Sequence, residues 1–478
     1  MKIKSLPLVV GALLSTLSIN AWSAEVSFDE AWQLLQQNNN SLAAQRANVE
    51  RYGHLKSATN SLNLPSVTIG ANYTRLDKDV TVSGHQLADS LSGVPDLSGL
   101  GNLGPAFGQV ASALGGITST IEHQDIFSSS IRAIWPIFTG GRITAAQTAA
   151  EGRQEEAESQ FAMEVQARYE DLSKYYFSVI LAKEVVETRL AAEQGLTKHR
   201  DYAIKLEQQG QIARVERLQA EASLDKATIE RKKAQHSLNI AQAALTQILG
   251  QVEKVEPRDE LFINRNLPPL DAFVDQTLDT YPGLAILDAK EKQASSLIKA
   301  ENGKYYPEVY AYGDYNLYEG DSLANQMTPD WLVGIGVSVP LLENTGRSEK
   351  VKAANSAVSQ VQFLKRQAKL DLSVLVEKTY LEAQQALDEA VGLNSSLSLA
   401  KENLLLRQKA FAQGLGRSID VVDAELYVAS IKTQQAAASF QYLLSLNKLL
   451  ALSNEMNSFN QYKYNSINPA KITSKDVS

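Results

Sequence analysis

Four short segments of the chain alternate apolar and polar residues with a period of two, which is typical of a two-faced β-strand. They cover residues 67–74, 127–137, 306–318 and 331–339, and the third alternates less regularly. Their lengths approach the roughly 9 to 11 residues that a transmembrane strand needs. The pattern therefore predicts four lipid-facing strands, although an ordinary antiparallel sheet packed on helices would alternate in the same way.

The aromatic residues of these segments indicate how the strands would lie in a membrane. Trp135 is at the helix-side end of the second segment, and Trp331 is at the far end of the fourth. Because Trp and Tyr gather at the two membrane interfaces, we predict that these tryptophans lie in opposite aromatic girdles. Tyr73 and Tyr315 are further candidates for these girdles.

Two long tracts, residues 137–256 and 341–468, contain no proline and are rich in Ala, Leu, Gln, Glu and Lys. Proline interrupts helix interiors and these five residue types favour helices, so both tracts predict long helices. In the second tract, two series of apolar and small residues recur every seven positions, which is typical of the a/d seam of a coiled coil. The series are Leu372, Thr379, Ala386, Leu393 and Ala400, and Ala383, Ala390, Leu397, Leu404 and Phe411. A soluble antiparallel coiled-coil hairpin fits this seam equally well.

The two tracts share the same landmarks, which indicates an internal duplication. A Gly-Arg pair opens each tract, and a Gln-Gly pair followed by an Ala-Glu pair interrupts each one further on. We expect each unit to read helix, strand, loop, strand, long helix, turn and shorter helix, with the first helices at residues 28–63 and 270–304. The first long helix, from Arg142 to Gln208, would be about 100 Å long at about 1.5 Å per residue.

The start of the chain has the pattern of an export signal. Lys2 and Lys4 precede an apolar stretch that ends in small residues. We therefore expect residues 1–24 to be a signal peptide, residues 25–257 and 258–453 to be the two structural repeats, and residues 454–478 to be a polar C-terminal tail. No run of about 18 apolar residues follows the signal, so we expect no membrane-spanning helix.

The number of predicted strands determines whether one chain could form a membrane barrel alone. Four strands cannot close a membrane barrel, whose smallest common form has eight, because open edges leave backbone groups unpaired in lipid. Several chains must therefore share one barrel. Residues 75–126 would then form one long external loop, and residues 319–329 a shorter one.

Charge and composition exclude other classes of function. The net charge of −8 argues against a nucleic-acid binder, which needs a basic surface. There is no cysteine, and the five histidines are scattered without ligand spacing. A GxGxxG match at residues 99–104 follows no parallel strand and runs into Pro105. We therefore expect no enzyme activity, no cofactor and no metal site.

The chain resembles the TolC-type outer membrane factor family over roughly residues 25–453. The features that carry this resemblance are the signal peptide, the duplicated units, the paired glycine turns, and the motifs Pro136/Gly141-Arg142 and Pro340/Gly346-Arg347. The resemblance implies a mainly α fold with a β-barrel portion in the Gram-negative outer membrane. Three chains with four transmembrane strands each would form a trimeric 12-stranded barrel, continued by a long α-helical coiled-coil barrel that extends into the periplasm.

The family function that this implies is an outer membrane channel-tunnel of a tripartite efflux or type I secretion system. The homotrimer would passively export drugs, amphiphiles or proteins. Its partners would be a periplasmic adaptor (membrane fusion) protein, an inner-membrane transporter of RND, MFS or ABC type, and outer membrane lipid.

The resemblance also implies which residues form the periplasmic tip. The turns at Gly210 and Gly414, with Gln211, Leu415 and Ser418, would dock the adaptor. In the second turn Asp420 and Asp423 are three residues apart and so share a helix face.

Threefold symmetry would turn these two aspartates into stacked carboxylate rings that attract cations and gate the pore. Asp420 would alternatively cap its helix. Glu216 is expected to pair with Arg417 across the tip. Phe411 and the position of Arg417 depart from the family pattern, so an apolar or differently paired closure is also open.

Two other classes of function remain compatible with parts of the sequence. A periplasmic coiled-coil adaptor or scaffold protein would show the same long hairpins, but it would not need two pairs of lipid-facing strands. An exported enzyme with a helical insertion would need a cluster of titratable residues in a pocket. The channel interpretation accounts for the whole chain, whereas each alternative accounts for about half of it.

Overall fold

The structure is a computed structural model that describes residues 24–83, 86, 118–320, 322–326, 328–342, 344–464 and 466–468. The predicted signal peptide, most of the predicted 75–126 loop and the end of the predicted tail lie outside these residues. Within the described part, none of the helices is long and apolar enough to cross a membrane.

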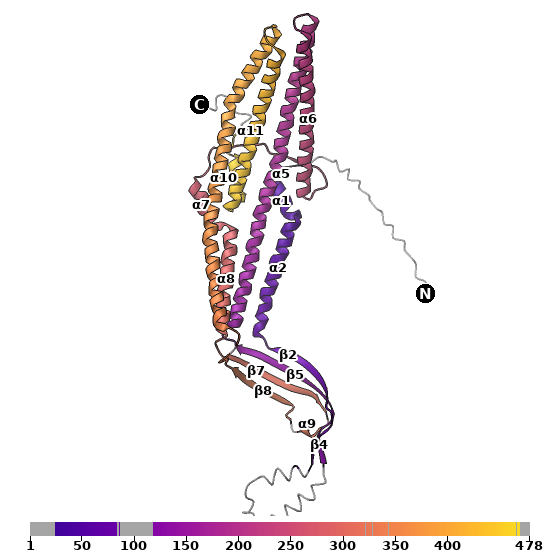
Figure 1. Cartoon of the computed structure of the whole chain (residues 1–478), viewed down its shortest axis with the longest axis vertical. Helices are drawn as coiled ribbons and strands as arrows, with labels where there is room; N and C mark the ends of the chain where they lie inside the picture. The colour runs from indigo at the N-terminus through magenta and orange to yellow at the C-terminus, as the bar shows by residue number, and fades with distance from the viewer. Residues whose placement is uncertain are drawn as a thin grey trace, which may run out of the picture. The chain divides into compact units, whose positions relative to one another are not determined.

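Two helical hairpins dominate the fold, and they confirm the long helices predicted from the proline-free tracts (Figure 1). Helix α5 (Arg142–Gln208) has 67 residues and is followed by α6 (Arg214–Ile248), which has 35. Helix α10 (Arg347–Ala412) has 66 residues and is followed by α11 (Ser418–Leu452), again with 35. The matched lengths are those expected of a duplicated chain.

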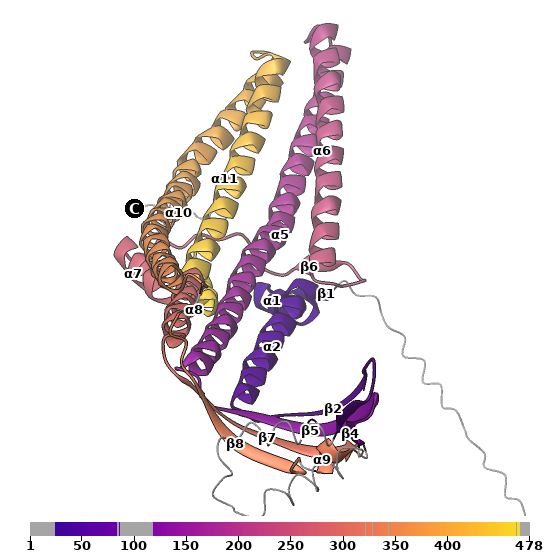
Figure 2. The same ribbon diagram turned by 60° about the horizontal axis from the view of Figure 1, so that its bottom comes forward.

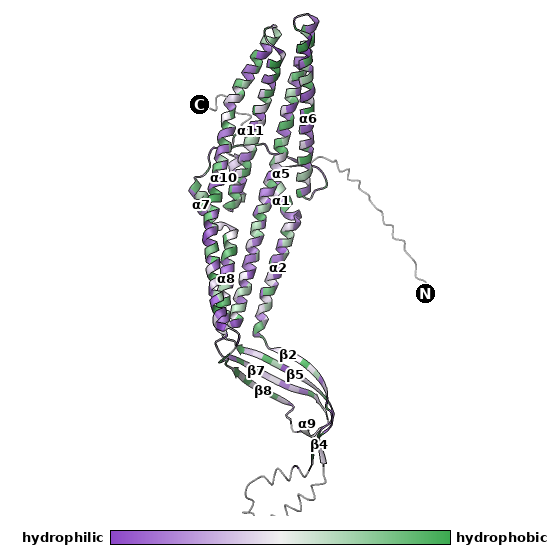
Figure 3. Cartoon of the chain, in the orientation of Figure 1, coloured by the Kyte–Doolittle hydropathy of each residue, from purple (hydrophilic) through white to green (hydrophobic). Residues whose placement is uncertain are grey.

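Burial follows the predicted coiled-coil seam of α10. Eight of its ten positions are buried, and the other two, Leu393 and Leu404, are half-buried. Leu397 and Ala400 pack against Val428 and Ile431 of α11, so the seam joins the two helices of this hairpin. Hydrophobic and hydrophilic residues interleave along both long helices, as Figure 3 shows.

The two upstream helical stretches are each broken once. Residues 28–63 form α1 (Phe28–Asn38), α2 (Asn40–Asn60) and a short 3₁₀ turn (Ser61–Asn63). The break lies at Asn39, whose extended backbone places its side chain to accept the N–H groups of Ser41 and Leu42 as an N-cap. Residues 270–303 form α7 (Leu270–Thr280) and α8 (Pro282–Gly303). The break lies at Tyr281, because the residue before a proline disfavours the helical conformation.

Four antiparallel strands form one sheet, and Figure 2 shows them side by side. The strands are β2 (Ser66–Arg75), β5 (Asp125–Phe138), β7 (Glu308–Glu319) and β8 (Trp331–Ser338), in the order β2-β5-β7-β8. The four predicted strands are therefore confirmed, with lengths of 10, 14, 12 and 8 residues.

The register gives this sheet two different faces. Residues directly opposite each other point to the same side, so Ile69, Ile131, Tyr315 and Trp331 form one row of the apolar face. This face is open to its surroundings: Ile69 is 71% exposed and Val333 74%. The other face carries polar residues and the ion pair between Arg132 Nε and Asp314 Oδ2 at 2.8 Å.

The aromatic residues fall on different rows of the apolar face. Trp331 lies opposite Tyr315, whereas Trp135 lies opposite Ala311, four residues along β7. Four residues correspond to about 13 Å at about 3.3 Å per residue, roughly half of a 25 Å apolar band. Tyr73 lies opposite Phe127, in the row nearest the loops. Their placement in lipid girdles stays a prediction.

The connections contain more structure than the two simple loops that were expected. β3 (Val80–Ser83) and β4 (Thr118–Glu122) pair antiparallel within the 75–126 segment. The 319–329 segment contains the short helix α9 (Leu323–Gln326), where the hydroxyl of Ser322 accepts the N–H of Asn325 as a local cap.

The two Gly-Arg motifs anchor the starts of the long helices. Gly140, Gly141 and Gly346 have positive φ, which lets the chain turn from strand into helix. The side chain of Arg142 forms an ion pair with Glu308. The guanidinium of Arg347 donates to the carbonyls of Lys304 and Pro340 at 2.9 and 3.1 Å.

Short segments from the two ends of the chain pack around an aromatic core. Phe28 of α1 packs against Tyr169, Tyr176, Phe177 and Phe459. The last of these belongs to α12 (Phe459–Tyr464), within the segment that was predicted as a polar tail. A 3₁₀ turn (Met456–Ser458) precedes α12, and β1 (Ala24–Val26) pairs in parallel with β6 (Val255–Pro257).

The chain forms two compact units, and each takes segments from both halves of the sequence. Counting only the described residues, one unit lies within residues 24–48, 158–286 and 365–468, and the other lies within residues 49–157 and 287–364. The second unit holds the four-stranded sheet. The turns of both helical hairpins, where the candidate site lies, belong to the first.

Candidate functional site

Both hairpins reverse through the same backbone motif. At the end of α5, Gly210 has φ +70°, and Gly210 and Gln211 donate to the carbonyls of Glu207 and Leu206 at 2.9 and 2.8 Å. At the end of α10, Gly414 has φ +68°, and Leu415 donates to Ala410 at 3.0 Å. These are Schellman motifs, in which the residue after the helix adopts positive φ and favours glycine.

The helices that follow these turns begin without side-chain caps of their own. The N-cap residues are Ala213 for α6 and Arg417 for α11, and neither side chain accepts a backbone N–H of the first turn. For α11 the missing acceptor comes from the other hairpin: Glu216 Oε2 accepts the backbone N–H of Ser418 at 2.7 Å. This contact corrects the expected partner of Glu216, which is the start of α11 and not the side chain of Arg417.

His199 of α5 makes a second link between the hairpins. Its Nε2 lies 2.8 Å from the hydroxyl of Ser418, and its ring is 4.6 Å from that of Phe411. The His199 side chain is 8% exposed, and burial lowers its pKa from 6.5 to about 4, with the nearby charge of Glu216 opposing this shift. His199 is therefore neutral at ordinary pH.

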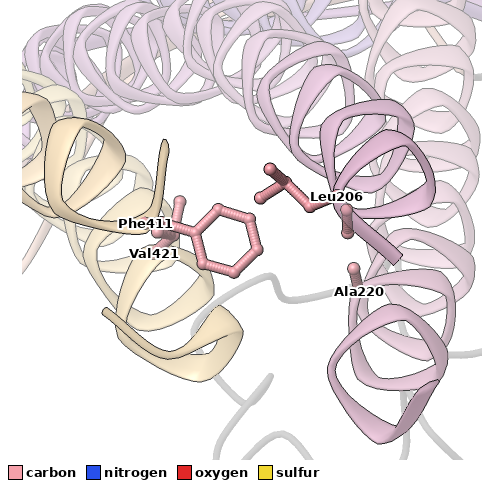
Figure 4. Packing of buried hydrophobic residues seen from close by; sticks show 5 residues of the cluster. Leu206, Ala220, Phe411 and Val421 are labelled. Carbon is pink, nitrogen blue, oxygen red and sulfur yellow. The ribbon is translucent and has the colours of Figure 1, made fainter. Parts of the chain in front are cut away.

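A small apolar cluster completes the joint between the hairpins. Phe411 and Val421 of one hairpin face Leu206 and Ala220 of the other, as Figure 4 shows. Ala203 belongs to the same buried cluster. Phe411 has no hydroxyl, so its ring contributes packing here, and the polar contacts come from the neighbouring His199 and Glu216. Within one chain the contact between the hairpins at this level is thus partly apolar, and how the tip closes stays a prediction.

Two arginines form ion pairs with one of the two predicted gate aspartates. Asp420 Oδ1 lies 3.1 Å from Arg417 Nη2, and Asp420 Oδ2 lies 3.7 Å from Arg407 Nη1. The hydrogen bond from Arg417 lowers the pKa of Asp420, so this carboxyl is ionised. Asp420 lies in the first turn of α11, where a negative charge also favours the helix N-terminus. Asp423 is exposed one turn later.

The Ala-Glu pairs of the two repeats are used differently. Glu221 lies 2.6 Å from Arg217, which also pairs with Glu207 at 2.5 Å across the first turn. Glu425 instead lies against Gly195 of α5, where a Cβ atom would be 2.5 Å from its carboxyl group. Burial raises the pKa of Glu425.

The predicted docking residues divide by exposure. Gly210, Gln211 and Gly414 are exposed, and Leu415 is 80% exposed. Ser418 is fully buried beneath His199 and Glu216, so it is not available to a partner. The expectation that Ser418 docks an adaptor is therefore wrong, because its hydroxyl and its N–H are both used within the chain.

Two important residues were missed by the sequence analysis. His199 lies between Leu196 and Ala203 with the 3-4 spacing of a seam, and Arg407 occupies the corresponding place between Leu404 and Phe411. A polar residue at a seam position was the available signal. Among the described residues, no group of three or more His, Asp or Glu side chains is arranged to hold a metal ion.

Comparisons with known proteins identify relatives of this chain. The family model described as outer membrane efflux protein matches residues 31–251 and 273–455. The outer membrane protein TolC of Vibrio cholerae is 21% identical over 461 residues, which are 93% of this chain and 94% of that protein. The protein CyaE of Bordetella pertussis is 21% identical over 267 residues, 54% of this chain, and the chain spans about half (56%) of its length.

A solved structure of the outer-membrane channel OprN superposes with a TM-score of 0.72, at 15% identity, over 90% of each chain. At that identity the likeness establishes the fold alone.

Proposed function

Because the chain belongs to the outer membrane efflux protein family, we propose that it is the exit duct of a tripartite efflux or type I secretion system and works as a homotrimer. The family membership confirms the resemblance drawn from the sequence and the location in the Gram-negative outer membrane. The relatives are channel proteins and not enzymes. The duct would pass drugs, amphiphiles or proteins outward, coupled through a periplasmic adaptor to an inner-membrane transporter.

The observation that carries the proposal is the four-stranded sheet. Its outer strands, β2 and β8, have no partner strand on their free sides within the described residues. Its apolar face is exposed along all four strands. Unpaired edges are costly in lipid. Three copies that pair β8 of one chain with β2 of the next would remove every edge and place the apolar face toward lipid.

Engineered cysteines test this pairing, and the chain offers a clean background because it has none of its own. Single cysteines at Val67 or Ile69 in β2 would be combined with cysteines at Val333 or Ile335 in β8. In outer membranes, at least one pair is expected to give a disulfide-linked trimer, whereas each single variant gives none. Ala133→Cys with Gly313→Cys is the control, because these residues face each other inside one chain and form only an intrachain bond.

Dimers without trimers, or recovery of the protein in the soluble periplasmic fraction, would contradict the proposal. The second outcome would favour the periplasmic scaffold.

The hairpin turns form the proposed gate and docking tip of this duct. Exposed Gly210, Gln211, Gly414 and Leu415 would meet the adaptor, while the contacts of Ser418 with His199 and Glu216 hold the two hairpins together. Asp420 and Asp423 keep their proposed role as symmetric carboxylate rings. The proposed gate also includes Arg407 and Arg417, because both form ion pairs with Asp420.

A further inference from the structure

A pocket of about 400 Å³ lies between the two hairpins, close to the contacts of Ser418. Helices α5, α6 and α11 all contribute to it. Its floor is apolar: Ala192, Ala227 and Val422 are buried, and Leu426 is half-buried beside them. Two of these residues are alanines, one on α5 and one on α6, and their short side chains leave the space that a leucine at either position would fill.

Two basic side chains on the rim of this pocket have no direct ion pair within the described residues. Arg189 of α5 and Lys226 of α6 line it, and neither makes a direct ion pair with any residue that the structure describes. Glu230 also lines the pocket but is already bonded to Lys233 at 2.8 Å. That bond lowers the pKa of Glu230, and the charges of Arg189 and Lys226 add to the shift. Exposed Asp423 is the other carboxylate, so two cations and two carboxylates line the pocket, and Glu230 already has Lys233, outside the lining, as its partner.

We propose that this pocket binds an amphiphile with one acidic head group and a linear apolar body, such as a medium-chain fatty acid. The volume is within the range of small-molecule sites, which are mainly apolar with a few polar groups that fix orientation. The apolar body would cover the floor formed by Ala192, Ala227 and Val422. The head group would accept charge-assisted hydrogen bonds from Arg189 and Lys226.

A ligand bound in this pocket would also stabilise the tip, and this effect on the duct rests on the proposed function. Val422, in the floor, packs against Leu196, one turn from His199 on α5. The ligand would touch α5 and α6 on one side and α11 on the other, so it would add contacts between the two hairpins. It would therefore hold the tip in the arrangement described above and reduce opening of the duct.

The test uses the full-length protein transferred from detergent into an amphipathic polymer. Binding of decanoate is measured by titration calorimetry, with decanol as the uncharged probe of the same length. We expect saturable decanoate binding and at least about tenfold weaker binding of decanol, which corresponds to about 1.4 kcal/mol. Equal binding of the two probes would mean non-specific partition and would overturn the proposal.

Matched variants locate the site. Ala227→Leu fills the pocket, and Ala234→Leu makes the same change one heptad further along α6 at a buried position outside the pocket. The first should abolish binding and the second should not. Should Ala227→Leu fail to fold, the surface variant Arg189→Gln/Lys226→Gln gives the answer, with Lys232→Gln as its control. Unchanged decanoate affinity in the double variant would refute the proposal.

Conductance of the same samples in planar bilayers separates this proposal from the function itself. Decanoate should lower the open probability of the natural protein but not that of the Arg189→Gln/Lys226→Gln variant. Binding without any effect on conductance would remove the regulatory part alone. Channels that open in every sample but bind no decanoate would remove the site and leave the duct intact.

Discussion

His199 is a buried titratable residue at the joint between the two hairpins. Its pKa is lowered to about 4 in the folded chain, against 6.5 for an unperturbed histidine. The unfolded chain therefore binds more protons between these values, so the stabilisation is complete above pH 6.5 and is lost as the pH falls toward 4. At pH 5 the loss is about 2 kcal/mol.

His199→Gln should remove this pH dependence while keeping a side chain able to bond Ser418. Thermal unfolding at pH 7.5 and pH 5.0 is the measurement. The natural protein should lose more stability on acidification than the variant. His236→Gln, at an exposed position of α6, is the control and should behave like the natural protein. An equal acid response of the natural protein and His199→Gln would show that the joint does not depend on this residue.

The turns need glycine because the backbone there has positive φ, and not because a larger side chain would clash with its neighbours. Nothing lies within 4 Å of a Cβ atom built on Gly414, yet its φ is +68°. Gly414→Ala should therefore destabilise the α10/α11 hairpin by about 1 kcal/mol. Gly392→Ala, inside α10 and equally open, should stabilise it by a similar amount, because alanine favours helix. Chemical denaturation of the two variants compares them, and a shift in the same direction would contradict this explanation.

At the scale of elements, the α10/α11 hairpin depends on its seam. Leu397 is 8% exposed and packs on α11, whereas Leu399, two residues later, is 71% exposed. Leu397→Ala should cost about 2–4 kcal/mol and Leu399→Ala much less. Hydrogen exchange of the α11 amides reports both changes. Equal loss of protection in the two variants would mean that the seam does not hold this hairpin together.

The elements show where sequence reasoning succeeds and where it stops. The seam of α10 and the faces of β2 and β8 are visible in the sequence, because period and burial follow from one chain segment at a time. The helix break at Tyr281 was left out of the expected 270–304 helix, although its signal, Pro282, was visible in the sequence. The contacts of Ser418 were not visible there, because His199 and Glu216 are 219 and 202 residues away and only the folded chain brings them together. Phe459 was overlooked within a polar tail.

At the scale of the whole molecule, the charges of the tip would be multiplied by symmetry. In the proposed trimer, each copy contributes Asp420 and Asp423 together with Arg407 and Arg417, so the net charge of these four residues is near zero. The cation selectivity of the open channel should therefore be modest. Arg407→Gln/Arg417→Gln should increase it severalfold, and Asp420→Ala/Asp423→Ala should reverse or abolish it.

Reversal potentials in asymmetric salt measure this selectivity in planar bilayers. Lys352→Gln, an exposed change near the start of α10, is the control for net charge. Selectivity that is the same in all four proteins would assign Asp420 to helix stabilisation alone and would place the selective region elsewhere in the duct.

The seam that joins α10 and α11 limits how the length of this protein can evolve. Insertion of one residue into a long helix rotates everything beyond it by about 100° and would turn Ala383 or Leu397 away from the partner helix. Insertion of seven residues restores the orientation. The same change would have to occur in the partner helix to keep the turns together. Related chains are therefore expected to differ in hairpin length by whole heptads, so that the distance each hairpin spans changes in steps of about 10 Å.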